Sequence, residues 1–175
     1  EQDLDKFLSN LQYNHKDKSL ALLKRGISRF NLDKLELAME DFNQLILRDP
    51  SIIETYRYRA EIYLLDDKKQ LARKDLEQAL LSDKTIPELY LLKGMTELSL
   101  NNFDIAVIDL NQFIKLSSKG HPDYFQAFHE RGVAEFFRKD SSSACINWNY
   151  AAENGYSKSI KFIQKNCNIY SKTPE

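Results

Sequence analysis

The chain has 175 residues and a mass of 20.5 kDa, with 42% hydrophobic and 29% charged residues, which is typical of one soluble domain with a continuous core. Its 25 basic and 26 acidic residues leave a net charge of -1, so the charge balance argues against a general nucleic-acid binder. No apolar run approaches the roughly 20 residues of a membrane-spanning helix, so none is predicted here.

One sequence pattern recurs four times: a small residue is followed, twelve residues later, by alanine. The four pairs are Gly26 and Ala38, Ala60 and Ala72, Gly94 and Ala106, and Gly132 and Ala144. Successive pairs begin 34, 34 and 38 residues apart. A period near 34 indicates stacked helix–turn–helix units, in which small residues let two helices cross closely. The sequence therefore predicts an all-α repeat protein.

The phase of this repeat sets the predicted elements in chain order. A leucine stripe places residues 1–15 in phase with the second helix of a unit, so an N-terminal half-repeat helix is expected there. Four whole units are predicted at 19–52, 53–86, 87–124 and 125–156, the third lengthened by a loop insertion. Gly155 marks a stop, and a capping helix over 157–170 is expected to turn Ile160, Ile163 and Cys167 inward and its lysines to solvent.

A basic residue and an acidic or amide residue sixteen positions later also recur in each unit. These pairs are Arg25 and Asp41, Arg59 and Asp75, Lys93 and Asp109, and Arg131 and Asn147. The spacing places both members at matching heights on the paired helices of one unit. Because the same pair occurs in every unit, we expect structural contacts within the repeats rather than a row of catalytic acids.

The small residues, the alanines and a third position resemble the tetratricopeptide repeat. The third position carries the large apolar residues Phe42, Leu76, Leu110 and Trp148, and Pro50 matches the closing proline of the family. The resemblance covers residues 19 to about 156. It implies a right-handed α-solenoid, in which the first helix of each unit lines a concave groove. It also implies a noncatalytic scaffold for protein–protein interaction.

By phase with that family, the groove is expected to bind a peptide or a partner helix. The predicted groove residues are Leu23, Ile27, Arg57, Tyr58, Glu61, Leu91, Leu92, Met95, His129 and Val133. Co-chaperone members of the family hold a C-terminal carboxylate with Lys, Asn and Arg side chains. The matching positions here are Leu23, Ile27, Tyr58, Glu88 and Leu92, or, starting one unit later, Arg57, Glu61, Leu92, Gln126 and Glu130. Neither set repeats the family's pattern, which predicts that this chain does not bind such a tail.

The two cysteines, Cys145 and Cys167, lie on the second helix of the fourth unit and on the capping helix. If these helices pack antiparallel, a disulfide is within reach, although two buried free thiols also fit the sequence. The run from Ala144 to Trp148, the Ala151–Gly155 segment and the late cysteine resemble the last unit of exported tetratricopeptide proteins from Bacteroidetes-type bacteria. That resemblance favours the disulfide and a periplasmic or envelope-associated protein, with the cytoplasm as the alternative.

No catalytic, cofactor-binding or metal site is predicted. The sequence has no Gly-rich phosphate loop, no His-Glu helical pair and no nucleophile elbow. A metal site from His121, Asp123 and His129 is an alternative, but their spacing matches no usual set of helical ligands. A second functional hypothesis is a self-association module that pairs through the ends of the stack, in which case the protein would be a weak homo-oligomer rather than a monomer.

Overall fold

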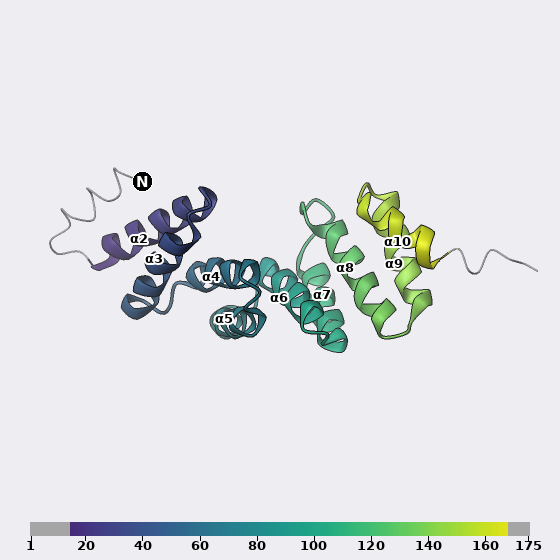
Figure 1. Cartoon of the computed structure of the whole chain (residues 1–175), viewed down its shortest axis with the longest axis horizontal. Coiled ribbons are helices and arrows are strands. Elements are labelled where there is room, and N and C mark those ends of the chain that lie inside the picture. The colour runs from purple at the N-terminus through teal and green to yellow at the C-terminus, as the bar shows by residue number, and fades with distance from the viewer. Residues whose placement is uncertain (1–14, 168–175) are drawn as a thin grey trace, which may run out of the picture. The chain divides into compact units, whose positions relative to one another are not determined.

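The computed structural model describes residues 15–167, which form helices joined by short turns and contain no strand (Figure 1). The half-repeat helix expected at 1–15 falls almost entirely outside the described residues. The described helices are α2 (His15–Asn31), α3 (Leu35–Arg48), α4 (Ile53–Leu65), α5 (Lys69–Ser82), α6 (Pro87–Ser99), α7 (Phe103–Leu116), α8 (Tyr124–Phe137), α9 (Ser141–Glu153) and α10 (Lys158–Asn166). The prediction of an all-α fold is confirmed over this part of the chain.

The chain divides after Lys84 into two compact units. In unit 1, α2 packs on α3 and α4 packs on α5, and α3 contacts α4. In unit 2, α6 packs on α7, α8 packs on α9, α7 contacts α8, and α10 packs on α9. Each pair therefore has a first helix (α2, α4, α6 or α8) and a second helix (α3, α5, α7 or α9), and α10 follows the last pair.

The turn inside each pair has the same backbone conformation. Asp33, Asp67, Asn101 and Lys139 lie in the left-handed region, with φ of 57°, 56°, 61° and 67°. Asp and Asn enter this region more readily than other side chains, so three of the four turns use suitable residues. After α9 the chain turns at Gly155, whose φ of 97° favours glycine. The predicted helix stop is therefore confirmed.

The helices of a pair cross closely where the repeated small residues lie. A Cβ atom added to Gly132 on α8 would lie 2.6 Å from Trp148 Nε1 and 3.1 Å from the Ala144 carbonyl oxygen on α9. Trp148 is fully buried, and its Nε1 donates a hydrogen bond of 3.1 Å to the His129 carbonyl. The predicted close crossing is therefore confirmed, and its cause is steric.

Candidate binding surface

The four basic and acidic or amide pairs expected from the repeat are all formed. In the first three units Arg25 Nη2 lies 2.5 Å from Asp41 Oδ1, Arg59 Nε lies 2.6 Å from Asp75 Oδ2, and Lys93 Nζ lies 2.5 Å from Asp109 Oδ2. Burial lowers the pKa of Arg59, but the hydrogen bond and charge of Asp75 outweigh it, so the net pKa is raised. These pairs join the two helices of each repeat and leave no row of free acids.

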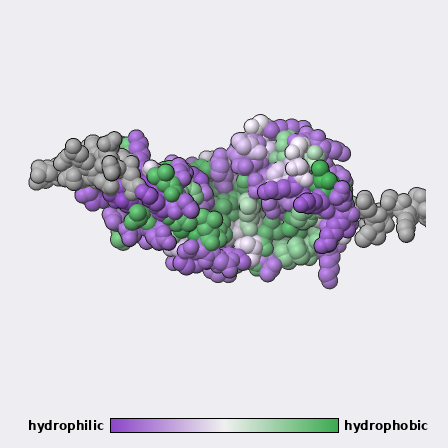
Figure 2. Space-filling model, turned by 45° about the horizontal axis from the view of Figure 1, so that its top comes forward, coloured by the Kyte–Doolittle hydropathy of each residue, from purple (hydrophilic) through white to green (hydrophobic). Residues whose placement is uncertain are grey.

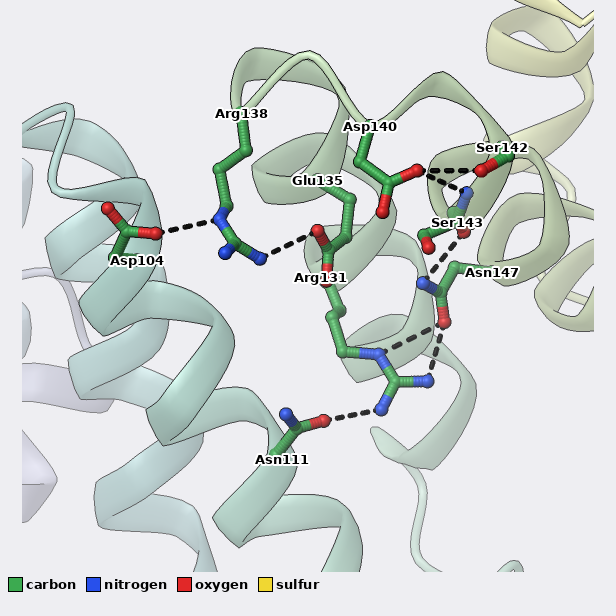
Figure 3. Close-up of polar contacts among 9 residues, drawn as sticks. All are labelled: Asp104, Asn111, Arg131, Glu135, Arg138, Asp140, Ser142, Ser143 and Asn147. Atoms are coloured by element: carbon green, nitrogen blue, oxygen red, sulfur yellow. Dashed lines mark hydrogen bonds and ion pairs between the residues drawn. The ribbon is translucent and has the colours of Figure 1, made fainter.

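The fourth pair differs because an amide takes the place of the carboxylate. Arg131 donates from Nε and Nη2 to Asn147 Oδ1 at 3.0 and 2.6 Å, and from Nη1 to Asn111 Oδ1 at 2.5 Å (Figure 3). The Asn147 side-chain amide in turn donates to the Ser143 carbonyl at 2.9 Å. Burial is the main cause that lowers the pKa of Arg131. The guanidinium is thus held by dipoles instead of an opposite charge.

A second polar contact in Figure 3 ties α8 to α7. Arg138 donates from Nε to Asp104 Oδ1 at 2.8 Å and from Nη1 to Glu135 Oε2 at 2.9 Å. Asp140 caps α9 by accepting from the Ser143 backbone N–H at 3.0 Å. These side chains fix the ends of α8 and α9, and so hold the helix that carries the unit 2 surface described below.

In unit 1 the predicted groove residues divide between the core and a small charged cluster. Leu23 and Ile27 pack against the buried core residues of unit 1 and are half-buried. Arg57 lies 4.0 Å above the Tyr58 ring and donates from Nη1 to Glu61 Oε1 at 2.5 Å. Burial raises the pKa of Glu61 against the opposing effect of Arg57. Arg57, Tyr58 and Glu61 therefore form one contact group on α4.

In unit 2 the predicted groove residues of α6 also differ in exposure. Leu91 is 7% exposed and belongs to the core with Leu110 and Phe113. Leu92 and Met95 are half-buried, and Met95 Sδ accepts a hydrogen bond of 3.6 Å from the Gln126 side-chain amide of α8. Leu92 and Met95 are therefore more accessible than Leu91, although Met95 also packs against this core.

His129 of α8 was predicted to face the groove, but its side chain is only 5% exposed. One ring nitrogen, Nδ1, lies 2.9 Å from Ser159 Oγ of α10, and the ring packs edge-on against Phe162 at 4.7 Å between centroids. Burial and then the positive charge of Lys158 lower the pKa of His129 to about 4. Because α10 covers it, His129 joins α8 to α10 instead of facing an open groove.

One turn further along α8, Val133 lines an apolar pocket of about 250 Å³ between α8 and α10. The residues around this pocket are Val133, Phe136, Phe137, Trp148, Lys161, Phe162, Lys165 and Asn166. Phe137 is 57% exposed and stacks on Phe103 of α7 at 5.0 Å between ring centroids. Figure 2 shows hydrophobic residues at the surface of both units, with hydrophilic residues around them. We call the pocket that Val133 lines the α8–α10 pocket.

The capping helix differs from its prediction in the face that it turns inward. Ile160 is 46% exposed, whereas Ser159 is fully buried and Phe162 packs on Trp148 at 5.2 Å between centroids. The expectation that Ile160 faces inward is therefore wrong. Ser159 takes the inward position through its contact with His129, whereas Ile163 and Cys167 are half-buried, in line with the prediction.

A disulfide ties the end of α10 to α9 in the structure. Cys145 and Cys167 are bonded, with their Cα atoms 5.7 Å apart and a separation of 22 positions in the sequence. Such a bond closes a loop that contains the whole of α10. The wall of the α8–α10 pocket is therefore fixed at one end by a covalent bond and in its first turn by the Ser159 contact with His129.

The described residues contain neither a cluster of metal ligands nor a helix that could span a membrane. Within residues 15–167, no three His, Cys, Asp or Glu side chains lie close enough together to hold a metal ion. Over the same residues, none of the helices has the length and apolar character needed to cross a bilayer.

Paired antiparallel helices with small residues at each crossing define a helical-repeat protein. Models of the family described as "Tetratricopeptide repeat" match residues 20–51 and 87–119, which are the first and third predicted units. Together with the helix pairs and their period, these matches show that the chain is a tetratricopeptide repeat protein. The curated proteins contain no match to it.

Solved structures share this fold at low sequence identity. The chain is similar to the crystal structure of MamA at 20% identity, which covers 90% of this chain and 87% of that one with a TM-score of 0.75. PilF of Pseudomonas aeruginosa is 14% identical, with 86% and 71% covered and a TM-score of 0.71. The first repeat domain of Spaghetti (RPAP3), solved with the HSP90 peptide SRMEEVD, is 22% identical, with 77% and 98% covered and a TM-score of 0.61.

Proposed function

We propose that the protein is a noncatalytic scaffold that binds a peptide or helix of another protein on the first-helix side of unit 2. The α8–α10 pocket is the observation that carries this proposal, because it is apolar, open to a partner and lined by the predicted groove residue Val133. Exposed apolar pockets rimmed by polar groups are typical of protein-interaction sites. A peptide or helix would place one large side chain in the pocket as its anchor.

The half-buried residues of α6 extend the proposed surface. Leu92 and Met95 supply flexible apolar contacts, and thioethers adapt to differently shaped partners. A pocket of about 280 Å³ in unit 1 is lined by Leu35, Glu36, Met39, Ile62, Tyr63, Asp66 and Lys68. Since three of those seven residues are charged, that pocket is a poorer receptor for an apolar anchor than the α8–α10 pocket.

The likeness to a repeat domain that was solved with an HSP90 peptide does not indicate that this chain binds the same peptide. The positions that match the carboxylate-holding residues of co-chaperones are Leu23, Ile27, Tyr58, Glu88 and Leu92. Three of these side chains are aliphatic, one is a phenol and one is acidic, so none carries the positive charge with which the family's Lys and Arg side chains hold a carboxylate. The proposed partner is therefore one recognised through apolar contact.

Site-specific photo-crosslinking in the native host tests the proposal. A benzoylphenylalanine in place of Phe137 reports contacts at the pocket, and the same residue in place of Ile108 is the matched control. Ile108 is 65% exposed and lies on α7, a second helix. We expect a discrete adduct with another protein from position 137 and none from position 108. Equal labelling from both positions, or none from either, would count against the proposal.

Self-association is the second candidate function, and it is separable in the same experiment. Because the α8–α10 pocket lies beside the last described helix, a second copy of the chain could also present an apolar side chain to it. Adducts of twice the monomer mass that contain only this chain would support self-association. Adducts with a different protein would support the scaffold.

We further propose that the protein works in an oxidising compartment, such as the bacterial periplasm or envelope. The observation that supports this is the close approach of the chain's two cysteines, since structural disulfides persist there and are rare in the cytosol. A free-thiol count on denatured protein, alkylated at lysis of the native host, tests it. No free thiol is the expected result, whereas two free thiols per chain would move the search for partners to the cytoplasm.

A further inference from the structure

The α8–α10 pocket has an apolar interior and a basic rim. Val133, Phe136 and Phe162 supply apolar side chains, and Trp148 lies at its base, fully buried. On one side the lining continues to Lys161 and Lys165, which are four residues apart on α10 and thus share one face of that helix. An apolar anchor in the pocket would therefore lie beside two ammonium groups.

The charge at this rim is not balanced by the surrounding residues. Among the residues that the structure describes, no carboxylate lines the pocket, and the sequence of α10 contains three lysines and no acidic residue. Neither Lys161 nor Lys165 forms an ion pair with another residue of the 15–167 range. This local charge contrasts with the chain as a whole, whose net charge is -1. A ligand here therefore meets a positive potential beside an apolar surface.

The size of the pocket limits its occupant. At about 250 Å³ it is smaller than the range of roughly 300–1,000 Å³ that is usual for small-molecule sites. It is suited to one large side chain, and the aromatic lining offers edge and face contacts to an aromatic ring. An anchor residue of a bound segment fits this volume better than a cofactor does.

We propose that the partner of this surface is an acidic segment of another protein that carries a large apolar or aromatic residue. The apolar residue enters the α8–α10 pocket, and Asp or Glu side chains next to it lie against Lys161 and Lys165. This inference rests on the proposed scaffold function and specifies the chemistry of its partner. Charge complementarity sets which segments bind and how fast, while the anchor supplies most of the affinity.

Selection from a library of random twelve-residue peptides displayed on phage tests this chemistry with the full, oxidised chain. Three variants accompany the unaltered chain. Lys161→Glu with Lys165→Glu reverses the rim charge, and Phe137→Asp alters the exposed edge of the pocket. Lys24→Glu with Lys74→Glu is the matched control, because both of its lysines are exposed and lie in unit 1.

We expect the selected peptides to carry an aromatic or large aliphatic residue next to Asp or Glu. Their recovery should fall about tenfold on the rim-reversed variant and should also fall as salt is raised, while the unit 1 control retains full recovery. Phe137→Asp should reduce recovery as well. Circular dichroism of each variant checks that the helices are intact.

The acidic partner and the scaffold function are refuted by different results. If the selected peptides lack acidic residues, or bind the rim-reversed variant equally well, yet are lost on Phe137→Asp, the acidic partner is refuted and the scaffold function stands. If recovery is unchanged on Phe137→Asp, both are refuted. Sedimentation that shows a dimer of the unaltered chain and a monomer of Phe137→Asp would identify a second copy as the occupant and would also refute the acidic partner.

Discussion

Replacing Gly132 with alanine tests how tightly the helices of the fourth repeat cross. The new methyl group would lie 2.6 Å from Trp148 Nε1 and 2.7 Å from Cδ1, well inside contact distance. The indole cannot retreat easily, since it is fully buried and its Nε1 is hydrogen-bonded to the His129 carbonyl. Overpacking costs about 1–3 kcal/mol and a lost hydrogen bond about 1 kcal/mol, against about 1 kcal/mol gained in helix propensity. We expect unit 2 to lose about 2 kcal/mol of unfolding free energy.

The matched control is the same substitution at Gly94, one repeat earlier. A Cβ there would lie 2.8 Å from Leu110 Cγ, but the equivalent pair in unit 1, Ala60 and Leu76, already accommodates alanine in a fully buried crossing. Gly94→Ala should therefore cost less than about 1 kcal/mol. Urea unfolding followed by the fluorescence of Trp148, the only tryptophan, reports both variants in unit 2. Equal costs at the two glycines, or none at Gly132, would refute the steric argument.

Two further predictions concern the ionisable groups of unit 2. Asn147→Asp supplies Arg131 with the carboxylate that the other three repeats have. It should raise the unfolding free energy, measured by urea titration, by about 1 kcal/mol. A lower unfolding free energy would contradict this prediction. The pKa of His129 is about 4 in the folded chain, against about 6.5 in the unfolded chain. Between these two pH values the unfolded chain therefore binds a proton at His129 that the folded chain does not bind. The unfolding free energy should therefore fall by about 3 kcal/mol between pH 6.5 and 4, and His129→Gln should make this fall smaller. An unchanged dependence of stability on pH in the variant would contradict the prediction.

The repeat pattern predicted those parts of the fold that depend on spacing alone. Small residues twelve positions before alanine located the close crossings, and a Cβ at Gly132 would lie 3.1 Å from the carbonyl oxygen of its partner Ala144. A spacing of sixteen between Arg59 and Asp75 placed both side chains at one height on paired helices, where they form a hydrogen bond of 2.6 Å. Such contacts lie inside one repeat, so the period determines them without knowledge of how repeats pack on each other.

The proposed binding surface was harder to predict because it depends on packing between repeats. Leu91 and His129 share the phase of groove residues, yet Leu91 joins the core and α10 covers His129. Periodicity assigns a residue to a helix face but does not divide that face between the core and solvent. The lysines of α10 are exposed, as predicted, but their spacing did not indicate that Lys161 and Lys165 also line a pocket. The signal that the sequence offered was Phe162, an aromatic residue between lysines.

Amide hydrogen exchange of the full chain, alone and with the partner identified through the Phe137 crosslink, tests most directly whether unit 2 binds a partner on its first-helix side. We expect slower exchange in α8 and α10 on binding, with little change in α7, which is exposed at Ile108. Protection concentrated in α7, or an exchange pattern unchanged by the partner, would contradict the proposed surface.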